Sequence, residues 1–155
     1  MSIHTTAARR ITLALAAAAA LCAAPLAQAR DQASLLPLEE AVRLGLQEGK
    51  LDGSVKFYLS GTPTPELLGA PLGEEHVNRR TNNPGKEPVF ACHWAALSGL
   101  MTLQDHAKAR GANAVVDLHS FYKEKTFKDP VNYECYRGSM LTGVSLKGTY
   151  VRTAP

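Results

Sequence analysis

The side chains with the greatest capacity for chemistry downstream of residue 29 are two cysteines, Cys92 and Cys135, and four histidines. In an exported protein an even pair of cysteines indicates a disulfide, and two buried free thiols are the alternative. The sequence has no Cys-x-x-Cys motif, the spacing typical of redox-active thiols. We therefore predict a structural bridge between Cys92 and Cys135, for which the chain-entropy model gives about 4 kcal/mol.

The histidines do not have the spacing of a metal site. His93 and His106 fall on one predicted helix but lie thirteen positions apart, whereas helical zinc ligands are four apart. Bridged cysteines cannot serve as thiolate ligands. The residue types suit a metal, so a site that uses His119 with another polar group near the sheet is one hypothesis. The other is that His76 and the remaining histidines only form hydrogen bonds.

The hydroxyl-based motifs lack the geometry for catalysis. Ser120 and Lys123 match the Ser-x-x-Lys spacing of serine acyl enzymes, which depends on a helical turn. Here the segment continues a predicted strand, where residues three apart face opposite sides, as do the neighbours His119 and Ser120. Asp117 and Glu134 can pair as carboxylates, although charges at strand edges are usually solvated. We assign no catalytic residue and expect neither enzymatic activity nor a cofactor.

Residues 1–29 have the three-part layout of a secretory signal peptide. A basic start at residues 9–10 precedes an apolar run over residues 11–21, and a small-x-small cleavage site occupies residues 27–29. The run is too short and too rich in alanine for a membrane span. We therefore predict cleavage after Ala29 and a periplasmic mature chain.

Lipidation of Cys22 is the alternative processing route. A lipoprotein signal needs a small residue where this sequence has Leu21. The later small-x-small site fits its consensus better, so we do not expect a lipid anchor at Cys22.

Removal of the signal changes the charge balance. Two of the 17 basic residues and none of the 14 acidic ones precede Arg30, so the formal net charge falls from +3 to +1. This small excess gives no reason to expect nucleic-acid binding. Residues 30–155 are enough for a single domain with a modest core, and they contain no apolar run long enough to span a bilayer.

The clearest periodicity spans residues 90–110, where apolar and small residues form one helical stripe. Lys108 and Arg110 suit the carbonyl end of that helix, and Gly111 can take the positive φ of a C-terminal stop. A strand rich in β-branched residues follows, and its alternate residues, beginning with Ala114, are expected to face the helix. The structural motif that joins helix to strand consists of Gly111, Ala112, Asn113, Ala114, Val115 and Val116.

Weaker patterns predict three further elements upstream. Apolar residues at helical spacing indicate a short helix over residues 35–47, and alternation indicates a strand over residues 55–59. Residues 76–81 are compatible with a weak strand. Arg79 and Arg80 within it are interpreted as a solvated pair rather than an anion site, because no aromatic residue is interleaved with them.

The C-terminal part has the alternation of an antiparallel sheet. Residues 123–131 are charged and predict an exposed hairpin loop. Residues 135–150 alternate between a polar face and an apolar face. The apolar face of this stretch is made of Tyr136, Met140, Val144 and Leu146. We therefore predict an α+β fold: a mainly antiparallel sheet of about 3–4 strands, the main helix (about 90–110) on one face, and a short N-terminal helix.

Several of these residues resemble the C-terminal domain of RcsF, the outer-membrane stress-sensor lipoprotein of the Rcs phosphorelay. The resemblance covers Cys92 in its helix, the unit over residues 107–120, and residues 135–137. It implies a helix packed on a small sheet, and it matches the two cysteines to one of the two disulfides of that domain. Phe121 and Met140 stand where the other bridge would be, as an apolar pair. The Gly-Ala-Asn-Ala-Val unit also resembles YbjQ-type domains, which are often labelled heavy-metal-binding.

The mature chain as a whole is similar to a family of small exported proteobacterial proteins. Its marks here are residues 53–59, 91–97, 111–116, 133–135 and 143–148. Members often carry the names of excinuclease ABC components, above all that of the excinuclease ATPase. An ATPase needs a glycine-rich loop ending in Gly-Lys-Ser/Thr to hold phosphates. Here Gly85 and Lys86 are followed by Glu87, which repels phosphate, so we do not expect that activity.

The function that these observations favour is a non-enzymatic periplasmic binding or interaction protein. The resemblance to RcsF implies a single RcsF-like domain over residues 30–155 and a connection to envelope stress. The expected partner is an envelope protein. A metal-binding periplasmic protein is the alternative hypothesis.

Overall fold

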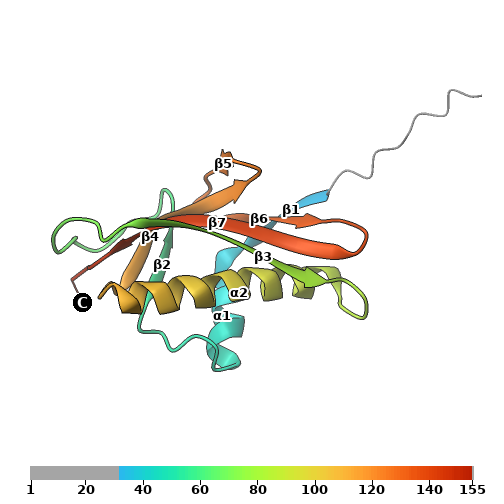
Figure 1. The fold of residues 1–155 in the computed structure, drawn as a ribbon, viewed down its shortest axis with the longest axis horizontal. Coiled ribbons are helices and arrows are strands. Elements are labelled where there is room, and N and C mark those ends of the chain that lie inside the picture. The colour runs from blue at the N-terminus through green and yellow to red at the C-terminus, as the bar shows by residue number, and fades with distance from the viewer. Residues whose placement is uncertain (1–31, 155) are drawn as a thin grey trace, which may run out of the picture.

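The computed structural model describes residues 32–154, which form two helices and a seven-stranded mixed sheet. The elements are β1 (Gln32–Pro37), α1 (Leu38–Gln47), β2 (Lys56–Leu59), β3 (Glu74–Asn82), α2 (Pro88–Ala109), β4 (Ala114–Tyr122), β5 (Lys125–Phe127), β6 (Asn132–Arg137) and β7 (Leu141–Val151). Both helices lie on one side of the sheet, and β5 stands on the other (Figure 1). The predicted α+β class is confirmed, whereas the predicted number of strands was too low. The predicted signal peptide, its cleavage site and Cys22 lie outside the described residues.

The last strand in the sequence is the centre of the sheet. β3 pairs with β7 antiparallel along one edge, from Glu74 opposite Thr149 to Asn82 opposite Leu141. The other edge of β7 is shared between β6 and β4, both antiparallel to it. β1 extends the sheet beyond β6, and β2 extends it beyond β4 in a parallel pairing. The sheet is therefore mixed, with one parallel pair among the described strands.

α2 begins where the sequence satisfies its first backbone N–H groups. The Glu87 carboxylate accepts hydrogen bonds from the amides of Val89 (3.2 Å) and Phe90 (2.9 Å). Pro88 occupies the first turn, where a missing N–H leaves no partner unsatisfied. The helix therefore starts two residues before the predicted boundary, and it stops at Gly111 (φ +70°) as predicted.

Small residues let α2 lie close to the sheet. A Cβ atom on Gly99 would lie 3.5 Å from the side chains of both Leu146 and Val77. The helix backbone is therefore separated from β7 and β3 by a single layer of side chains. The predicted stripe is buried, with at most 4% exposure at Cys92, Ala96, Leu100, Leu103 and Ala107. Within residues 32–154, no helix is apolar over a length sufficient to cross a membrane.

A disulfide joins α2 to β6 inside this core. The Cα atoms of Cys92 and Cys135 lie 5.8 Å apart, and the two residues are 4% and 0% exposed. The predicted bridge is confirmed. Because the two sulfur atoms are bonded to each other, neither is available as a thiolate ligand or nucleophile.

The N-terminal helix starts later than predicted because a proline separates it from a strand. Pro37 has an extended ψ of 128°, and a residue that precedes proline is disfavoured in the helical region. Residues 32–37 therefore pair with β6, and α1 begins at Leu38. Leu35, which was expected in the first turn of the helix, lies in β1 with 52% exposure.

A bulge at Asp117 changes which residues of β4 face the core. Asp117 has φ +48°, and the register between β4 and β7 shifts after Val116. Val115 and Leu118 therefore pack in the core, whereas Val116, which strict alternation assigned there, is half-buried. An extra residue in one strand reverses the alternation beyond it, and this is what made the predicted face wrong.

Residues 135–150 form two strands and a turn, so one alternation cannot describe them. Cys135 of β6 and Val144 of β7 both face the core, but Tyr136 lies on the opposite face with its ring stacked on Tyr122. Met140 lies in the turn before β7 and is 65% exposed. The predicted apolar face was therefore wrong for Tyr136 and Met140, because the turn resets the phase.

Phe121 and Met140 do not form the apolar pair implied by the resemblance. Phe121 packs against the rings of His76 and His119, with centroids 5.0 and 6.4 Å away. Its neighbour in β4, Ser120, pairs with Leu146. Met140 therefore lies about five residues, or roughly 16 Å, further along β7.

The predicted exposed loop over residues 123–131 contains β5. Lys123 and Glu124 both have positive φ (51° and 62°), as a two-residue hairpin turn requires. β4 and β5 therefore form a tight hairpin that rises from the sheet on the side opposite the helices (Figure 1).

Glu75 ties β3 to the last turn of α2. Its carboxylate accepts hydrogen bonds from the Tyr150 hydroxyl (2.7 Å) and from His106 Nδ1 (2.6 Å), and the Arg110 guanidinium lies 3.4 Å away. Partial burial opposes ionisation of Glu75, but these hydrogen bonds and the two cationic groups outweigh it and hold its pKa below the ordinary value. Burial and the same carboxylate raise the pKa of Tyr150.

Glu75→Gln is expected to destabilise the fold by about 1–3 kcal/mol at pH 7, because a neutral amide cannot replace charge-assisted hydrogen bonds. A carboxyl with a depressed folded-state pKa stabilises the fold fully above its unfolded pKa of about 4.3. That contribution is lost as the pH falls through the lower folded value. In urea unfolding, the difference between wild type and Glu75→Gln should therefore shrink below about pH 4.

Glu74→Gln is the matched control for this measurement. Glu74 is 52% exposed and pairs with Lys147 on the surface, so its loss is expected to cost less than about 1 kcal/mol. A loss at Glu75 no larger than that at Glu74, or one that persists unchanged in acid, would contradict the assigned role of Glu75.

Candidate functional site

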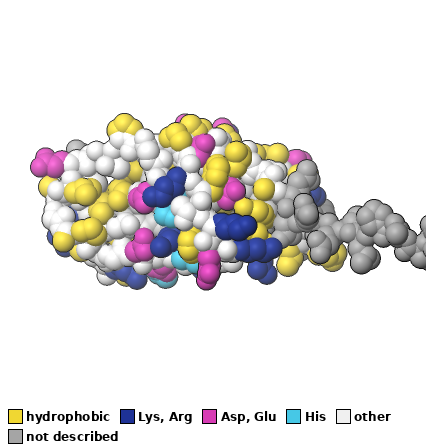
Figure 2. Space-filling view, turned by 90° about the horizontal axis from the view of Figure 1, so that it is seen from above, with side chains coloured by type: hydrophobic (Ala, Val, Ile, Leu, Met, Phe, Trp, Pro, Cys, Tyr) yellow, Lys and Arg dark blue, Asp and Glu magenta, His cyan; other side chains and the backbone are white. Residues whose placement is uncertain are grey.

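On the face of the sheet opposite the helices, side chains from three strands align in rows. Arg80 of β3, Gly143 of β7 and Tyr136 of β6 form one row, because Gly143 is the cross-strand partner of both other residues. The next row holds Asn78 beside Ser145. Figure 2 shows this outer face, on which basic, acidic and histidine side chains are interspersed.

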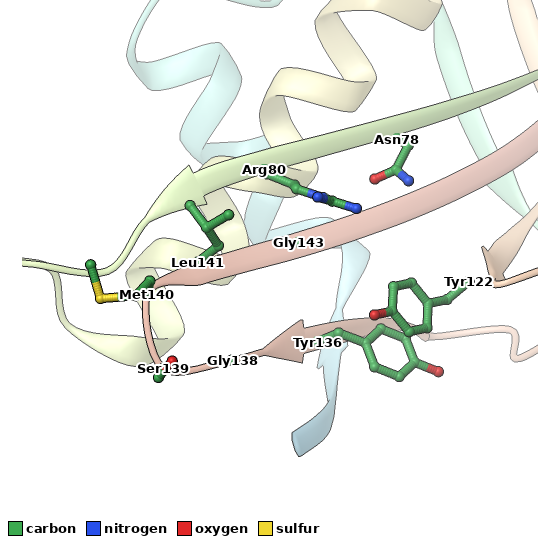
Figure 3. A pocket seen from close by; sticks show the side chains of 9 residues that line it. All are labelled: Asn78, Arg80, Tyr122, Tyr136, Gly138, Ser139, Met140, Leu141 and Gly143. Carbon is green, nitrogen blue, oxygen red and sulfur yellow. The ribbon is translucent and has the colours of Figure 1, made fainter. Parts of the chain in front are cut away.

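A cavity of about 300 Å³ opens over the row that contains Gly143. Its lining is polar on one side and aromatic on the other, and it includes Asn78, Arg80, Tyr122, Tyr136 and the turn over residues 138–141 (Figure 3). Gly143 leaves the floor open, since a Cβ atom there would lie 3.4 Å from Cγ of Arg80. The volume is at the low end of the range for small-molecule sites. The cavity therefore suits a small ligand or a single group of a larger partner.

Two stacked tyrosines form the aromatic wall. The rings of Tyr122 and Tyr136 lie 3.7 Å apart between centroids and 19° from parallel. Partial burial, together with a hydrogen bond to the Glu134 carboxylate, raises the pKa of Tyr136 to about 12. The Tyr136 hydroxyl therefore stays protonated near neutral pH and cannot act as a base there.

Arg80 is the cation of the cavity. Within residues 32–154 its exposed side chain makes no hydrogen bond, ion pair or ring contact. The neighbouring Arg79 points to the opposite face, where its guanidinium donates to Thr102 Oγ1 of α2 (2.8 Å). The interpretation of these arginines as one solvated pair without aromatic neighbours was wrong, because the aromatic residues beside Arg80 come from β4 and β6.

Asn83 holds the turn that closes one end of the cavity. Its Nδ2 donates to the Gly138 carbonyl (2.8 Å), and its Oδ1 accepts from Thr142 Oγ1 (2.6 Å). Its backbone N–H donates to the Met140 carbonyl (2.9 Å). Asn83 is 8% exposed, so these bonds are largely shielded from water. This end of the cavity is therefore ordered before any ligand binds, which reduces the entropic cost of binding.

A histidine–serine contact beside the cavity was missed in the sequence. His76 Nε2 lies 2.7 Å from Ser145 Oγ, across strands that are 69 positions apart. Ser145 Oγ also lies 2.7 Å from the Phe121 carbonyl, which can only accept. The hydroxyl proton therefore goes to Phe121, and His76 donates to Ser145 instead of activating it. With Ser145 1% exposed, the contact is structural.

The catalytic candidates in β4 each have a separate partner. His119 Nδ1 donates to the Asp117 carbonyl (2.6 Å), and Ser120 Oγ accepts from the Glu134 amide (2.7 Å). Both oxygens of the Asp117 carboxylate accept from Lys128 Nζ at 2.9 Å. Asp117 and Glu134 are therefore not a carboxylate pair, and His119 and Ser120 are not a catalytic pair.

The remaining candidates are also dispersed. His93 and His106 lie on α2 as predicted; His93 Nδ1 contacts the Tyr133 hydroxyl (3.1 Å), and His106 binds Glu75. Lys123 Nζ lies over the Tyr122 ring, 5.0 Å from its centroid. In the part of the chain that the structure describes, no three His, Cys, Asp or Glu side chains are placed to hold a metal ion. The motif over residues 111–116 forms the turn from α2 into β4.

A second hollow, mostly apolar, lies between α1 and β2. Two adjoining parts of about 200 and 370 Å³ share Val42, Phe57 and Tyr58. The charged side chains in its lining are Glu39 and Lys56, one in each part. This hollow lacks the combination of arginine and stacked aromatic rings found on the outer face.

Comparisons of the chain with protein-family models, with curated proteins and with solved structures found no match, so the outer-face cavity is the feature that bears most directly on function.

Proposed function

We propose that the protein is a non-enzymatic binding module of the periplasm and that the outer-face cavity is its binding site. The observation that carries this proposal is the guanidinium of Arg80, which has no internal partner and lies beside a preformed aromatic wall. Arginine and aromatic residues are enriched where proteins recognise partners, because both offer large contact areas and directional contacts.

The groups around the cavity suit binding better than proton transfer. A catalytic acid or base needs a pKa near the working pH and a position within reach of the reacting atom. The pKa of Tyr136 is raised to about 12, and the proton of Ser145 is held by the Phe121 carbonyl. Arg80 stays charged at any physiological pH. These side chains can hold and orient a ligand without exchanging protons with it.

The proposed location and cellular role rest on the sequence. Residues 1–29 have the layout of a signal peptide with a cut after Ala29, and the RcsF resemblance connects the domain to envelope stress. An envelope protein is the proposed partner. The disulfide between Cys92 and Cys135 supports an oxidising compartment, where such bridges persist.

N-terminal sequencing of the protein from a periplasmic extract tests the location. The mature chain is expected to begin at Arg30. Recovery of the intact precursor from the cytosol alone would contradict export.

Affinity capture from envelope extracts tests the binding role. The mature chain is expected to recover a specific partner, and Arg80→Gln is expected to lose it, because the cavity then has no cation. Arg43→Gln is the matched control, since Arg43 is an exposed arginine of α1 whose side chain pairs with Glu40. Equal recovery by all three proteins would rule out the cavity as the binding site. Failure of the wild-type chain to recover any partner would count against the binding role.

A further inference from the structure

We propose that the outer-face cavity binds a planar organic anion, of which an aromatic carboxylate is the simplest member. This inference rests on the proposed binding role and adds the chemical class of the ligand. It follows from three observations: a cation without a partner, a floor without a side chain, and a wall of stacked rings.

The cation selects for negative charge. The nearest acidic groups of the neighbouring strands are already engaged, since Glu134 is hydrogen-bonded to Tyr136 and Glu74 pairs with Lys147 at 2.9 Å. Arg80 is therefore left without a counterion among the described residues. A guanidinium presents two parallel N–H donors that match the two oxygens of a carboxylate. The side-chain amide of Asn78 lies in the same wall and offers a further donor (Figure 3).

The floor selects for a flat ligand. Arg80 and Tyr136 flank Gly143 in the same cross-strand row. Neighbouring strands lie about 4.8 Å apart, so the backbones of Arg80 and Tyr136 are separated by roughly 9.6 Å. No side chain fills that gap, because its middle position is glycine. The gap can therefore admit a ring lying on bare backbone between the arginine and the tyrosine.

The wall and the volume define the body of the ligand. The stacked rings of Tyr122 and Tyr136 favour an aromatic group, which packs on such rings in offset or edge-to-face geometry. The volume of about 300 Å³ suits a ligand with one or two rings. The same planar anion can be a free small molecule or an aromatic residue that carries the terminal carboxylate of a partner protein.

Calorimetric titration of the mature chain, residues 30–155, with 2-naphthoate tests the proposal. Two analogues separate the contributions: 2-naphthalenemethanol keeps the rings without the charge, and cyclohexanecarboxylate keeps the charge without the planar ring. Each analogue is expected to bind at least tenfold more weakly than 2-naphthoate. Equal affinity for the neutral analogue would exclude recognition of the anion, and equal affinity for the saturated acid would exclude recognition of the ring.

Two variants and one control locate the site. Arg80→Gln is expected to weaken 2-naphthoate at least tenfold. Gly143→Val places a side chain on the floor and is expected to abolish binding, while valine suits a strand and its Cβ meets only the flexible stem of Arg80 at 3.4 Å. Arg43→Gln should bind as wild type does. Urea midpoints within experimental error of wild type show that the variants are folded.

Amide chemical shifts in a two-dimensional NMR titration read out the position directly. The shifts are expected at Gly143 and in the turn over residues 138–141, and changes confined to the hollow between α1 and β2 would overturn the proposal. N-acetylphenylalanine, compared with its amide, tests the second source of the ligand. Tighter binding of N-acetylphenylalanine than of 2-naphthoate would assign the site to the C-terminus of a partner protein.

The two proposals fail in different ways. A partner that is captured by the wild-type chain and lost by Arg80→Gln, with no binding of any aromatic anion, would keep the binding role and remove the ligand class. Binding of 2-naphthoate that is unaffected by Arg80→Gln and Gly143→Val would remove both the site and the ligand class.

Discussion

Reduction of the Cys92–Cys135 disulfide is expected to lower the free energy of unfolding by about 4 kcal/mol. The bridge connects residues 43 positions apart, so it restricts a large loop in the unfolded chain. It also joins α2 to β6 within the core, where both cysteines are buried. A domain of this size has a total stability of about 5–15 kcal/mol, so the loss is a large share of it.

Equilibrium unfolding of the mature chain in urea, with and without reductant, measures this loss. The double variant Cys92→Ala/Cys135→Ala is the control that removes the bond without a reductant, and it is expected to show a similar shift. The mature chain has no other cysteine, so thiol titration reports on this bond alone. Two titratable thiols in the native protein from the periplasm would overturn the assignment of a structural bridge.

Leu100→Ala is expected to destabilise the fold by about 2–5 kcal/mol. Leu100 is 0% exposed at the centre of the face that α2 presents to the sheet. Its neighbours on that face include Ala96 and Leu103 of the same helix, whose positions are set by the helix backbone. The surroundings cannot collapse to fill the space, so the truncation leaves a cavity as well as losing the transfer free energy of the side chain.

Leu46→Ala is the matched control for the truncation of Leu100. It makes the same chemical change on the other helix at a position that is 49% exposed, and the expected loss is below about 1.5 kcal/mol. Both variants are compared with wild type by urea unfolding at one pH. Similar losses at Leu46 and Leu100 would show that the interface between α2 and the sheet is not the main core of the domain.

The features that could be predicted from the sequence are local ones. α2 was predicted because its apolar stripe, the cations of its last turn and the stop at Gly111 all lie within one segment. The Cys92–Cys135 bridge was predicted because the mature chain has only this pair. In both cases the physical cause can be found without knowing which strands are neighbours.

The outer-face cavity could not be predicted because it depends on strand pairing. Arg80, Gly143 and Tyr136 come together only when β3 and β6 lie on opposite sides of β7. The stacking partner, Tyr122, reaches them from the far end of β4. The bulge at Asp117 alters the alternation before Tyr122, so even the face on which that ring lies does not follow from a two-residue period.

The place of β7 in the sheet has a consequence for folding during synthesis. β7 supplies the pairing partner of β3, β4 and β6, yet all three precede it in the chain. None of these pairings can form before residues 141–151 have left the ribosome. A nascent chain that stops short of them contains long-range contacts awaiting their partner, and closing such contacts is slow. The domain is therefore expected to remain without stable tertiary structure until synthesis is nearly complete, as a chain that crosses a membrane unfolded requires.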